Sequence, residues 1–179
     1  MIFSLIGPRG AGKTTISKRL AELTGWPRMA TDEWVEKIDG RRPALIIAAD
    51  GLDTYLRLEK EAFAACLADL RERMTNAPGV LFDVGGSLIL APDVREELRR
   101  IGEVVYLQAP PEILAARLQP ENPGLLPAEM RRLIAERDAH FLETAHLEID
   151  THDLGIEASV TVLMNWVAAR CGICEFRPE

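Results

Sequence analysis

Residues 7–14, near the N-terminus, restrict the fold of this chain more than any other segment. They read Gly-Pro-Arg-Gly-Ala-Gly-Lys-Thr and fit the pattern G-x-x-x-x-G-K-[ST] at every fixed position. An apolar run at 2–6 precedes them, and a helical pattern carrying Ile16, Leu20 and Leu23 follows them. This order of strand, glycine-rich turn and helix predicts a phosphate-binding loop, because glycines allow positive φ and let backbone N–H groups approach an anion.

The side chains at the end of this loop match the chemistry of a nucleoside triphosphate bound with a metal ion. Lys13 supplies a positive charge for the β- and γ-phosphates, and Thr14 supplies a hydroxyl for magnesium. Thr15 stands in the first turn of the helix, whose dipole also attracts anions. We therefore expect ATP and Mg²⁺ as cofactors, with the nucleotide also held by the loop residues Gly7, Gly10, Ala11 and Gly12.

Short apolar runs alternate with helical patterns along the rest of the chain. Further strands are predicted at 27–30, 79–84, 104–107 and 147–149. The helices between them include one opened and capped by Thr31 or Asp32, and others at 52–74, 92–101, from 110 or 111, up to about 142, and 156–169. This alternation predicts an α/β fold: a three-layer α/β/α sandwich with a parallel sheet of about five strands, in a single domain spanning 1–179.

Composition limits the partners and the location of the protein. A net charge of −7 argues against a general nucleic-acid binder, and no apolar run approaches the roughly 20 residues that span a bilayer. We expect a cytoplasmic protein with a small-molecule substrate, no nucleic-acid or membrane partner, and a monomeric or weakly homo-oligomeric state. Cys66, Cys171 and Cys174 are too few for a disulfide framework, and the last two have no second ligand pair for zinc.

Three further segments extend the pattern set by the loop. They are Asp83-Val-Gly-Gly-Ser-Leu-Ile-Leu, Val104-Val-Tyr-Leu-Gln-Ala-Pro-Pro-Glu and Glu136-Arg-Asp-Ala-His-Phe. With them, the chain from residue 1 to about residue 150 resembles the shikimate kinase family, within the nucleoside-monophosphate-kinase-like group of P-loop kinases. The resemblance implies ATP-dependent transfer of the γ-phosphoryl group to a hydroxyl of shikimate or a related small hydroxy acid, as in aromatic amino acid biosynthesis. It also implies a short lid, placed at the proline-rich loop 119–127.

The resemblance assigns roles to individual positions. Asp32 matches the carboxylate that binds and activates the substrate hydroxyls, and Arg137 matches the late arginine that pairs with the substrate carboxylate. Gly85 and Gly86 match two of three consecutive glycines whose backbone meets the substrate, the third position being Ser87. Two further residues match by position. Glu59 matches a glutamate of the substrate site, or else it is a charge at the edge of an apolar helix face, and Arg117 matches an arginine that stacks on adenine, or else it has a surface role.

Three positions depart from the family pattern. Ala30 stands where the family has an aspartate near magnesium, Leu56 stands where it has an early substrate arginine, and the segment 122–126 lacks the lid arginine. Asp83, at the end of a strand, is expected to replace the lost carboxylate as a catalytic and metal-binding residue; the alternative is an aspartate bonded to the following glycine turn. Arg57 is expected to reach the substrate in place of the lost arginine, or else to lie on a solvated face.

These losses leave a second function open. An ATP-binding protein with an altered substrate or little kinase activity, acting as a sensor or regulatory subunit, would also carry an intact phosphate loop and an arginine-free lid. Tight ATP binding without turnover on any acceptor would favour that alternative. The ATP-dependent kinase remains the leading prediction.

Overall fold

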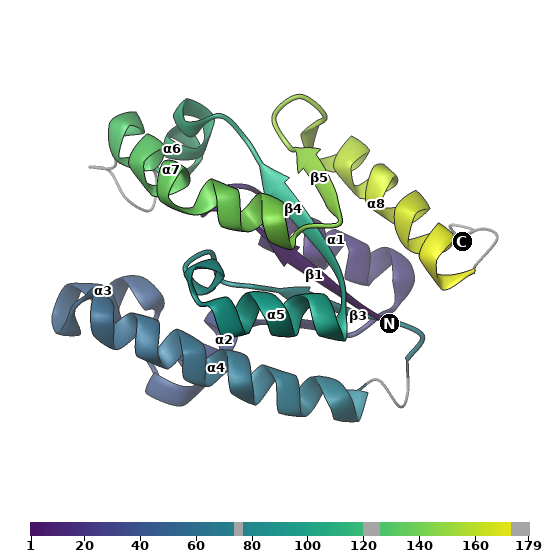
Figure 1. Ribbon diagram of the computed structural model, residues 1–179, viewed down its shortest axis with the longest axis horizontal. Helices are drawn as coiled ribbons and strands as arrows, with labels where there is room; N and C mark the ends of the chain where they lie inside the picture. The colour runs from purple at the N-terminus through teal and green to yellow at the C-terminus, as the bar shows by residue number, and fades with distance from the viewer. Residues whose placement is uncertain (74–76, 120–125, 173–179) are drawn as a thin grey trace.

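Five short strands pair in parallel into one sheet, in the order β2-β3-β1-β4-β5 (Figure 1). The computed structural model describes residues 1–73, 77–119 and 126–172. The strands are β1 (Ile2–Ile6), β2 (Arg28–Ala30), β3 (Val80–Asp83), β4 (Gly102–Gln108) and β5 (Leu147–Asp150). The central strands read as continuous apolar runs because both of their faces are buried. The predicted α/β sandwich with a five-stranded parallel sheet is confirmed.

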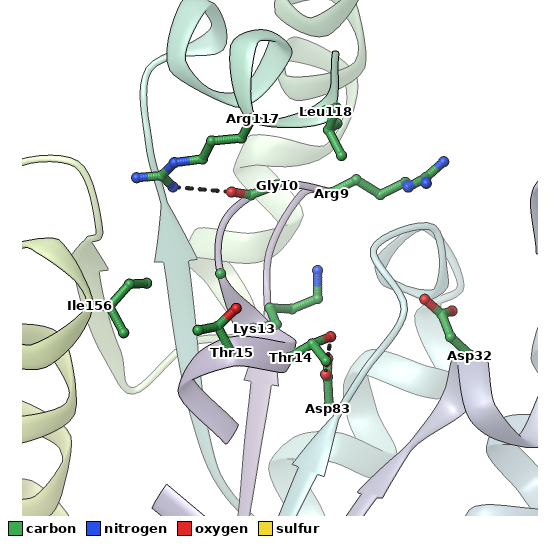
Figure 2. A pocket seen from close by; sticks show the side chains of 11 residues that line it. Arg9, Gly10, Lys13, Thr14, Thr15, Asp32, Asp83, Arg117, Leu118 and Ile156 are labelled. Atoms are coloured by element: carbon green, nitrogen blue, oxygen red, sulfur yellow. Dashed lines mark hydrogen bonds between the residues drawn. The ribbon is translucent and has the colours of Figure 1, made fainter. Parts of the chain in front are cut away.

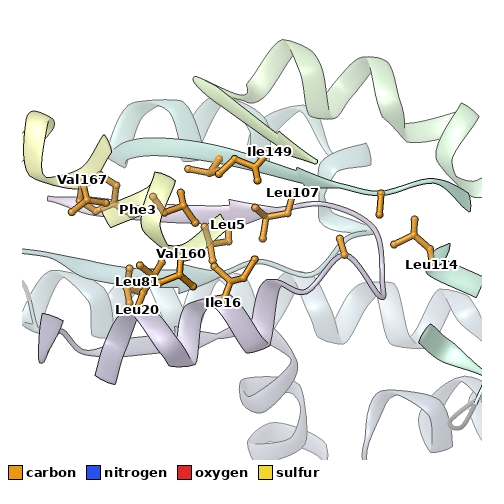
Figure 3. Close-up of a cluster of buried hydrophobic side chains, with 14 of the residues drawn as sticks. Phe3, Leu5, Ile16, Leu20, Leu81, Leu107, Leu114, Ile149, Val160 and Val167 are labelled. Atoms are coloured by element: carbon orange, nitrogen blue, oxygen red, sulfur yellow. The ribbon is translucent and has the colours of Figure 1, made fainter. Parts of the chain in front are cut away.

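Helices cover both faces of the sheet. One face packs against α1 (Lys13–Thr24), α6 (Pro111–Leu118) and α8 (Gly155–Cys171), and the other against α4 (Leu52–Arg73), α5 (Pro92–Ile101) and α7 (Pro127–Thr144). Successive strand residues point to opposite faces, so Phe3 and Leu5 join the first cluster (Figure 3) while Ile2 and Ile6 join the second. This packing holds the strand ends, and the loops that follow them, in fixed positions.

Two short helices form a separate layer beside α4. They are α2 (Thr31–Asp39) and α3 (Pro43–Asp50), and they share a third apolar cluster with α4 that contains Val35, Ile46 and Tyr55. α3 and the 3₁₀ turn η1 (Leu88–Leu90) are not predicted from the sequence. α3 is short and apolar almost throughout, so its sequence carries no helical period to recognise.

Two local expectations are wrong. Neither Thr31 nor Asp32 caps α2, because its N-cap is Ala30 and no side chain bonds to the first turn. The Thr31 hydroxyl is buried and instead accepts a hydrogen bond from the backbone N–H of Gly85, at 2.8 Å. Leu23, expected on the packed face of α1, is 40% exposed because it lies beyond the sheet-facing stripe of Ile16 and Leu20.

Some predicted features lie outside the described residues. They include positions 120–125 of the predicted lid, most of its arginine-free segment, and Cys174. No helix in the described ranges is both long enough and apolar enough to cross a membrane.

The order of the strands determines where a ligand can bind. β1 lies between β3 and β4, so the chain leaves it toward one edge of the sheet and later returns to build the other. In open parallel sheets, ligands bind outside the carboxyl ends of the strands at such a reversal. The loop after β1 and Asp83 at the end of β3 both lie at this position.

Candidate active site

The loop between β1 and α1 has the geometry expected of a phosphate-binding loop. Gly7, Gly10 and Gly12 all adopt positive φ, and α1 begins directly after Gly12. A side chain at position 7 would place its Cβ 2.2 Å from the carbonyl oxygen of Leu107, so the loop passes directly against β4. Glycine is therefore required at position 7 by both backbone conformation and space.

A cavity of about 460 Å³ opens above this loop (Figure 2). It brings together the loop, one carboxylate from the start of α2, one from the end of β3, and the ends of α6 and α8. Its lining consists of Arg9, Gly10, Gly12, Lys13, Thr14, Thr15, Asp32, Asp83, Arg117, Leu118 and Ile156. Nearly all the residues predicted to bind the nucleotide thus face one cavity, while Ala11 is buried beneath it in the core.

Lys13 holds its ammonium group over the loop. Its Nζ donates to the carbonyl oxygens of Gly7 at 2.9 Å and Pro8 at 3.1 Å. Burial lowers the pKa of Lys13, although the carboxylates of Asp83, Asp32 and Glu59 act in the opposite direction. An anionic phosphate in the cavity would favour the charged lysine and so strengthen its own binding.

Thr14 and Asp83 meet where a metal ion of a bound nucleotide would lie. The Thr14 hydroxyl donates to Oδ2 of Asp83 at 2.8 Å, across the gap between α1 and β3 (Figure 2). Hydroxyl and carboxylate oxygens suit Mg²⁺, which usually takes one or two protein ligands together with substrate phosphates. Within the described ranges no group of three or more His, Cys, Asp or Glu residues could hold a metal ion. The two side chains therefore fit a metal ion that arrives with the nucleotide.

Asp83 occupies the place opposite the missing aspartate. In the pairing of β2 with β3, the register partner of Asp83 is Ala30. The carboxylate at the end of β3 is thus one strand away from position 30, at the same level of the sheet. The bonding partners of Asp83 are Thr14 and Arg28, whereas the N–H of Gly85 donates to Thr31, which argues against the simple turn-bonding alternative.

A second cluster adjoins the nucleotide cavity and centres on Glu59. This side chain is 1% exposed and accepts hydrogen bonds from the Tyr55 hydroxyl at 2.9 Å and from the Ser87 hydroxyl. The Tyr55 oxygen also lies 3.4 Å from Oδ1 of Asp32. A Cβ at Gly85 would lie 1.9 Å from Oε1 of Glu59, so the loop that follows β3 presses its backbone against this carboxylate.

The two loops are in direct contact. A Cβ at Gly86 would lie 2.8 Å from the carbonyl oxygen of Gly7, which belongs to the phosphate loop. Glycine at position 86 therefore lets the loop after β3 and the phosphate loop pack backbone to backbone. The loop that borders the second cluster is thus held against the phosphate loop.

Burial is the main cause of the pKa shifts of the Asp32 and Glu59 carboxyl groups. Desolvation raises the pKa of Asp32, opposed mainly by the charge of Lys13. Desolvation also raises the pKa of Glu59, opposed by its hydrogen bonds from Ser87 and Tyr55 and by the charge of Arg137. Arg137 itself has a buried Nε without a hydrogen-bond partner in the described part of the chain, and Oε2 of Glu136 lies 3.9 Å from it. An unpaired buried guanidinium N–H favours an anionic ligand.

The structure does not bring Arg57 to either cluster. Its side chain is 64% exposed and pairs with Glu61 one turn further along α4, at 2.9 Å. Adjacent helical residues point about 100° apart, so Arg57 faces solvent while Leu56 and Glu59 face inward. The expectation that Arg57 reaches the substrate is wrong for this structure.

Arg117 lies at the cavity but is anchored to the protein. Its guanidinium donates to the carbonyl oxygen of Gly10 and the hydroxyl of Thr151, both at 3.0 Å, and to the carbonyl oxygen of Thr151 at 3.2 Å. It thus ties the phosphate loop to the chain after β5. Together with Leu118 and Ile156 it forms the end of the cavity farthest from Asp32 (Figure 2). This is the end available to a base.

The sequence reasoning missed Tyr55 and Arg28, and it named Ser87 by position without its bond to Glu59. Tyr55 and Ser87 hold Glu59, and Arg28 bonds to Asp83. Tyr55 stands four residues before Glu59 on one helix, a spacing that places the two side chains together and was available as a signal. Arg28 lies 55 residues from its partner, and only the pairing of β2 with β3 connects them.

Comparison with known proteins decides the family. A family model described as shikimate kinase matches residues 9–168. The chain is 38% identical over 155 residues to a shikimate kinase of Oleidesulfovibrio alaskensis, a match that covers 82% of this chain and 86% of that protein. The chain belongs to the shikimate kinase family. A shikimate kinase 2 of an Enterobacter species is 36% identical over 156 residues, covering 82% and 84% of the two chains.

Solved structures agree with this assignment. A shikimate kinase from Acinetobacter baumannii, in complex with shikimate, superposes with a TM-score of 0.77 at 29% identity, covering 94% of this chain and 93% of that one. A deoxyadenosine kinase from M. mycoides shares the fold alone, with a TM-score of 0.66 at 15% identity and coverage of 94% and 100%. The predicted shikimate kinase-like, ATP-dependent phosphotransferase is confirmed, and the sensor or regulatory alternative is not favoured.

Proposed function

We propose that this member of the shikimate kinase family transfers the γ-phosphoryl group of Mg²⁺-bound ATP to a hydroxyl of shikimate or a closely related small hydroxy acid. One observation carries the proposal. The carboxylate of Asp32 shares a cavity with the phosphate loop, while Gly85, Glu59 and Arg137 surround the adjoining space. An acceptor held there has its hydroxyl next to the transferred group.

The nucleotide is bound mainly by the phosphate loop. Backbone N–H groups of the loop and the ammonium of Lys13 contact the phosphates, and Arg117 with Ile156 bounds the base. Thr14 and Asp83 would hold Mg²⁺, which when bound neutralises charge on the β- and γ-phosphates. The reaction asks for positioning and charge neutralisation rather than covalent chemistry by the protein.

The acceptor is bound mainly by the second cluster. Asp32 orients the reacting hydroxyl and accepts its proton, a role that suits a carboxyl group whose pKa is raised by burial. Gly85 and Gly86 allow close approach of their backbone, and Glu59 fixes the loop that contains them. The unpartnered N–H of Arg137 meets the acceptor carboxylate. Leu56 offers no charge in support, so Arg137 carries this interaction without the second arginine of the family pattern.

The experiment is ADP release from ATP and Mg²⁺, measured with and without shikimate, with Lys13→Ala as the control. Shikimate-dependent release that the control abolishes supports the proposal. The methyl ester of shikimate, which lacks the anionic charge, should be a poorer acceptor if Arg137 recognises the carboxylate. Release with another hydroxy acid but not with shikimate would move the substrate within the proposed class. No release with any hydroxy acid, in protein that binds ATP, would overturn it.

A further inference from the structure

Arg28 places a largely buried positive charge against Asp83, a residue that lines the nucleotide cavity. It begins β2, its side chain is 11% exposed, and its guanidinium makes three contacts. Nε donates to the Ser17 hydroxyl at 2.7 Å, one terminal nitrogen donates to Glu33 at 2.7 Å, and the other donates to Oδ2 of Asp83 at 3.2 Å. One arginine therefore joins α1, α2 and β3 beside Asp83, a residue that lines the cavity.

Arg28 and Thr14 hold Asp83 through the same oxygen. Both hydrogen bonds that the structure gives Asp83 end on Oδ2. This leaves Oδ1 as the oxygen available to a cation in the cavity, and the position of the carboxylate is set from two sides. Ser17 completes the arrangement, since its hydroxyl accepts from Arg28 and donates to the backbone carbonyl of Thr14 at 3.2 Å.

The charge of Arg28 also changes what a bound nucleotide meets. The side chain of Asp83 is 6% exposed and lines the cavity, so an unpaired carboxylate there would repel the triphosphate whenever no metal ion is present. A neighbouring guanidinium offsets that repulsion. The same guanidinium competes for the carboxylate with an incoming Mg²⁺ ion, because both cations are attracted to one negative charge.

We propose that Arg28 is a positioning residue for Asp83 and that it sets how strongly nucleotide binding depends on magnesium. Arg28 keeps the site compatible with metal-free nucleotide, and it raises the Mg²⁺ concentration needed for full binding. The inference rests on the proposed function only in that ATP binds at the phosphate loop with Mg²⁺. It does not depend on the identity of the acceptor.

The test measures binding of a fluorescent N-methylanthraniloyl ATP, first in EDTA and then during a Mg²⁺ titration, with no acceptor present. We expect Arg28→Gln to weaken metal-free binding about tenfold and to lower the half-saturating Mg²⁺ concentration by a similar factor, the order of effect for one charge at an effective dielectric of about 20. Arg28→Lys, which keeps the charge, should restore most of both values. Arg19→Gln removes an exposed arginine of α1 that pairs with Glu22, and it serves as the control for loss of one distant charge.

Asp83→Asn tests the same link from the other side. It should strengthen metal-free binding, because a negative charge leaves the cavity and Arg28 keeps only Glu33 as a carboxylate partner, and it should remove most of the gain that Mg²⁺ brings. The double variant Arg28→Gln/Asp83→Asn should return metal-free affinity to near the parent value. It also replaces Arg28→Gln as the test if that variant does not fold, because it leaves no unpaired carboxylate at position 83. Folded Arg28→Gln protein with the parent's affinity in EDTA and the parent's Mg²⁺ midpoint would overturn the proposal. So would an Asp83→Asn variant, or a double variant, with the parent's magnesium dependence.

Discussion

Replacing Gly85 by alanine would place a methyl carbon 1.9 Å from Oε1 of Glu59 and 3.1 Å from the Thr31 hydroxyl. A carbon and an oxygen that are not bonded do not approach this closely, so one group must move. Glu59 is not free to swing away, because Tyr55 and Ser87 hold its two oxygens and the residue is 1% exposed. The loop after β3 is held as well, since the Gly85 N–H donates to Thr31.

The cost of this substitution follows from what must break. Displacing Glu59 loses at least one hydrogen bond to a buried carboxyl group, and displacing the loop loses the bond to Thr31; each costs about 1–3 kcal/mol. We expect Gly85→Ala to be destabilised by about 2–4 kcal/mol. At roughly 2–4 °C per kcal/mol for a chain of this size, its Tm should fall by roughly 5–15 °C. The KM for the acceptor should rise at least about tenfold if the loop shifts by a fraction of an ångström.

Thermal unfolding followed by circular dichroism and steady-state ADP release measure these two effects. A double-mutant cycle with Glu59→Ala identifies the clash, because alanine at 85 should cost at least about 1 kcal/mol less once the Glu59 side chain is gone. Gly51→Ala is the control for a glycine replaced without a clash: nothing lies within 4 Å of its Cβ position. Its φ of 84° and ψ of 168° add backbone strain of about 1–3 kcal/mol that Gly85 does not carry, but the acceptor KM should not change. A Gly85→Ala variant with the Tm and acceptor KM of the parent would refute the reasoning.

Three further predictions concern the acceptor side of the site. Burial raises the pKa of Glu59 above its ordinary 4.5, so the folded protein loses stability as the pH rises above that value and Glu59 ionises. Glu59→Gln should therefore gain stability relative to the parent as the pH rises above 4.5, by at most about 1.4 kcal/mol per pH unit, and a gap in Tm that does not grow above that pH would contradict this. Tyr55→Phe removes the hydroxyl between Asp32 and Glu59. We expect kcat to fall about tenfold with little change in the KM for ATP, whereas a KM for ATP that rises by the same factor would point to general misfolding. Leu56→Arg adds the arginine of the family pattern, and it should lower the KM for shikimate but not for its methyl ester; the same change for both would show that the new charge does not reach the carboxylate.

The parts of the fold that depend on local pattern were predictable. The phosphate loop has fixed glycine positions between an apolar strand and a helix, and the strands buried on both faces read as apolar runs. The wrong predictions come mainly from contacts between residues that are far apart in the sequence. Thr31 is a residue type that commonly caps helices, but its hydroxyl accepts a hydrogen bond from Gly85, 54 residues away. The sequence of α3 is too short and too uniformly apolar to show a helical period.

Asp83 shows how much of a site depends on sheet register. Read along the chain, Ala30 is the loss of a carboxylate and Asp83 is an unrelated aspartate 53 positions later. The sheet makes Ala30 and Asp83 register partners. Arg28, two residues before Ala30, donates a hydrogen bond to the Asp83 carboxylate. The position of Asp83 at the end of an apolar strand predicted that it replaces the lost group, but it gave no reason for an arginine beside it. Once β2 and β3 pair, the reason is electrostatic: a carboxylate moved to a 6% exposed position at the end of β3 needs a counter-charge until a metal ion is bound, and Arg28 is the cation that the neighbouring strand supplies.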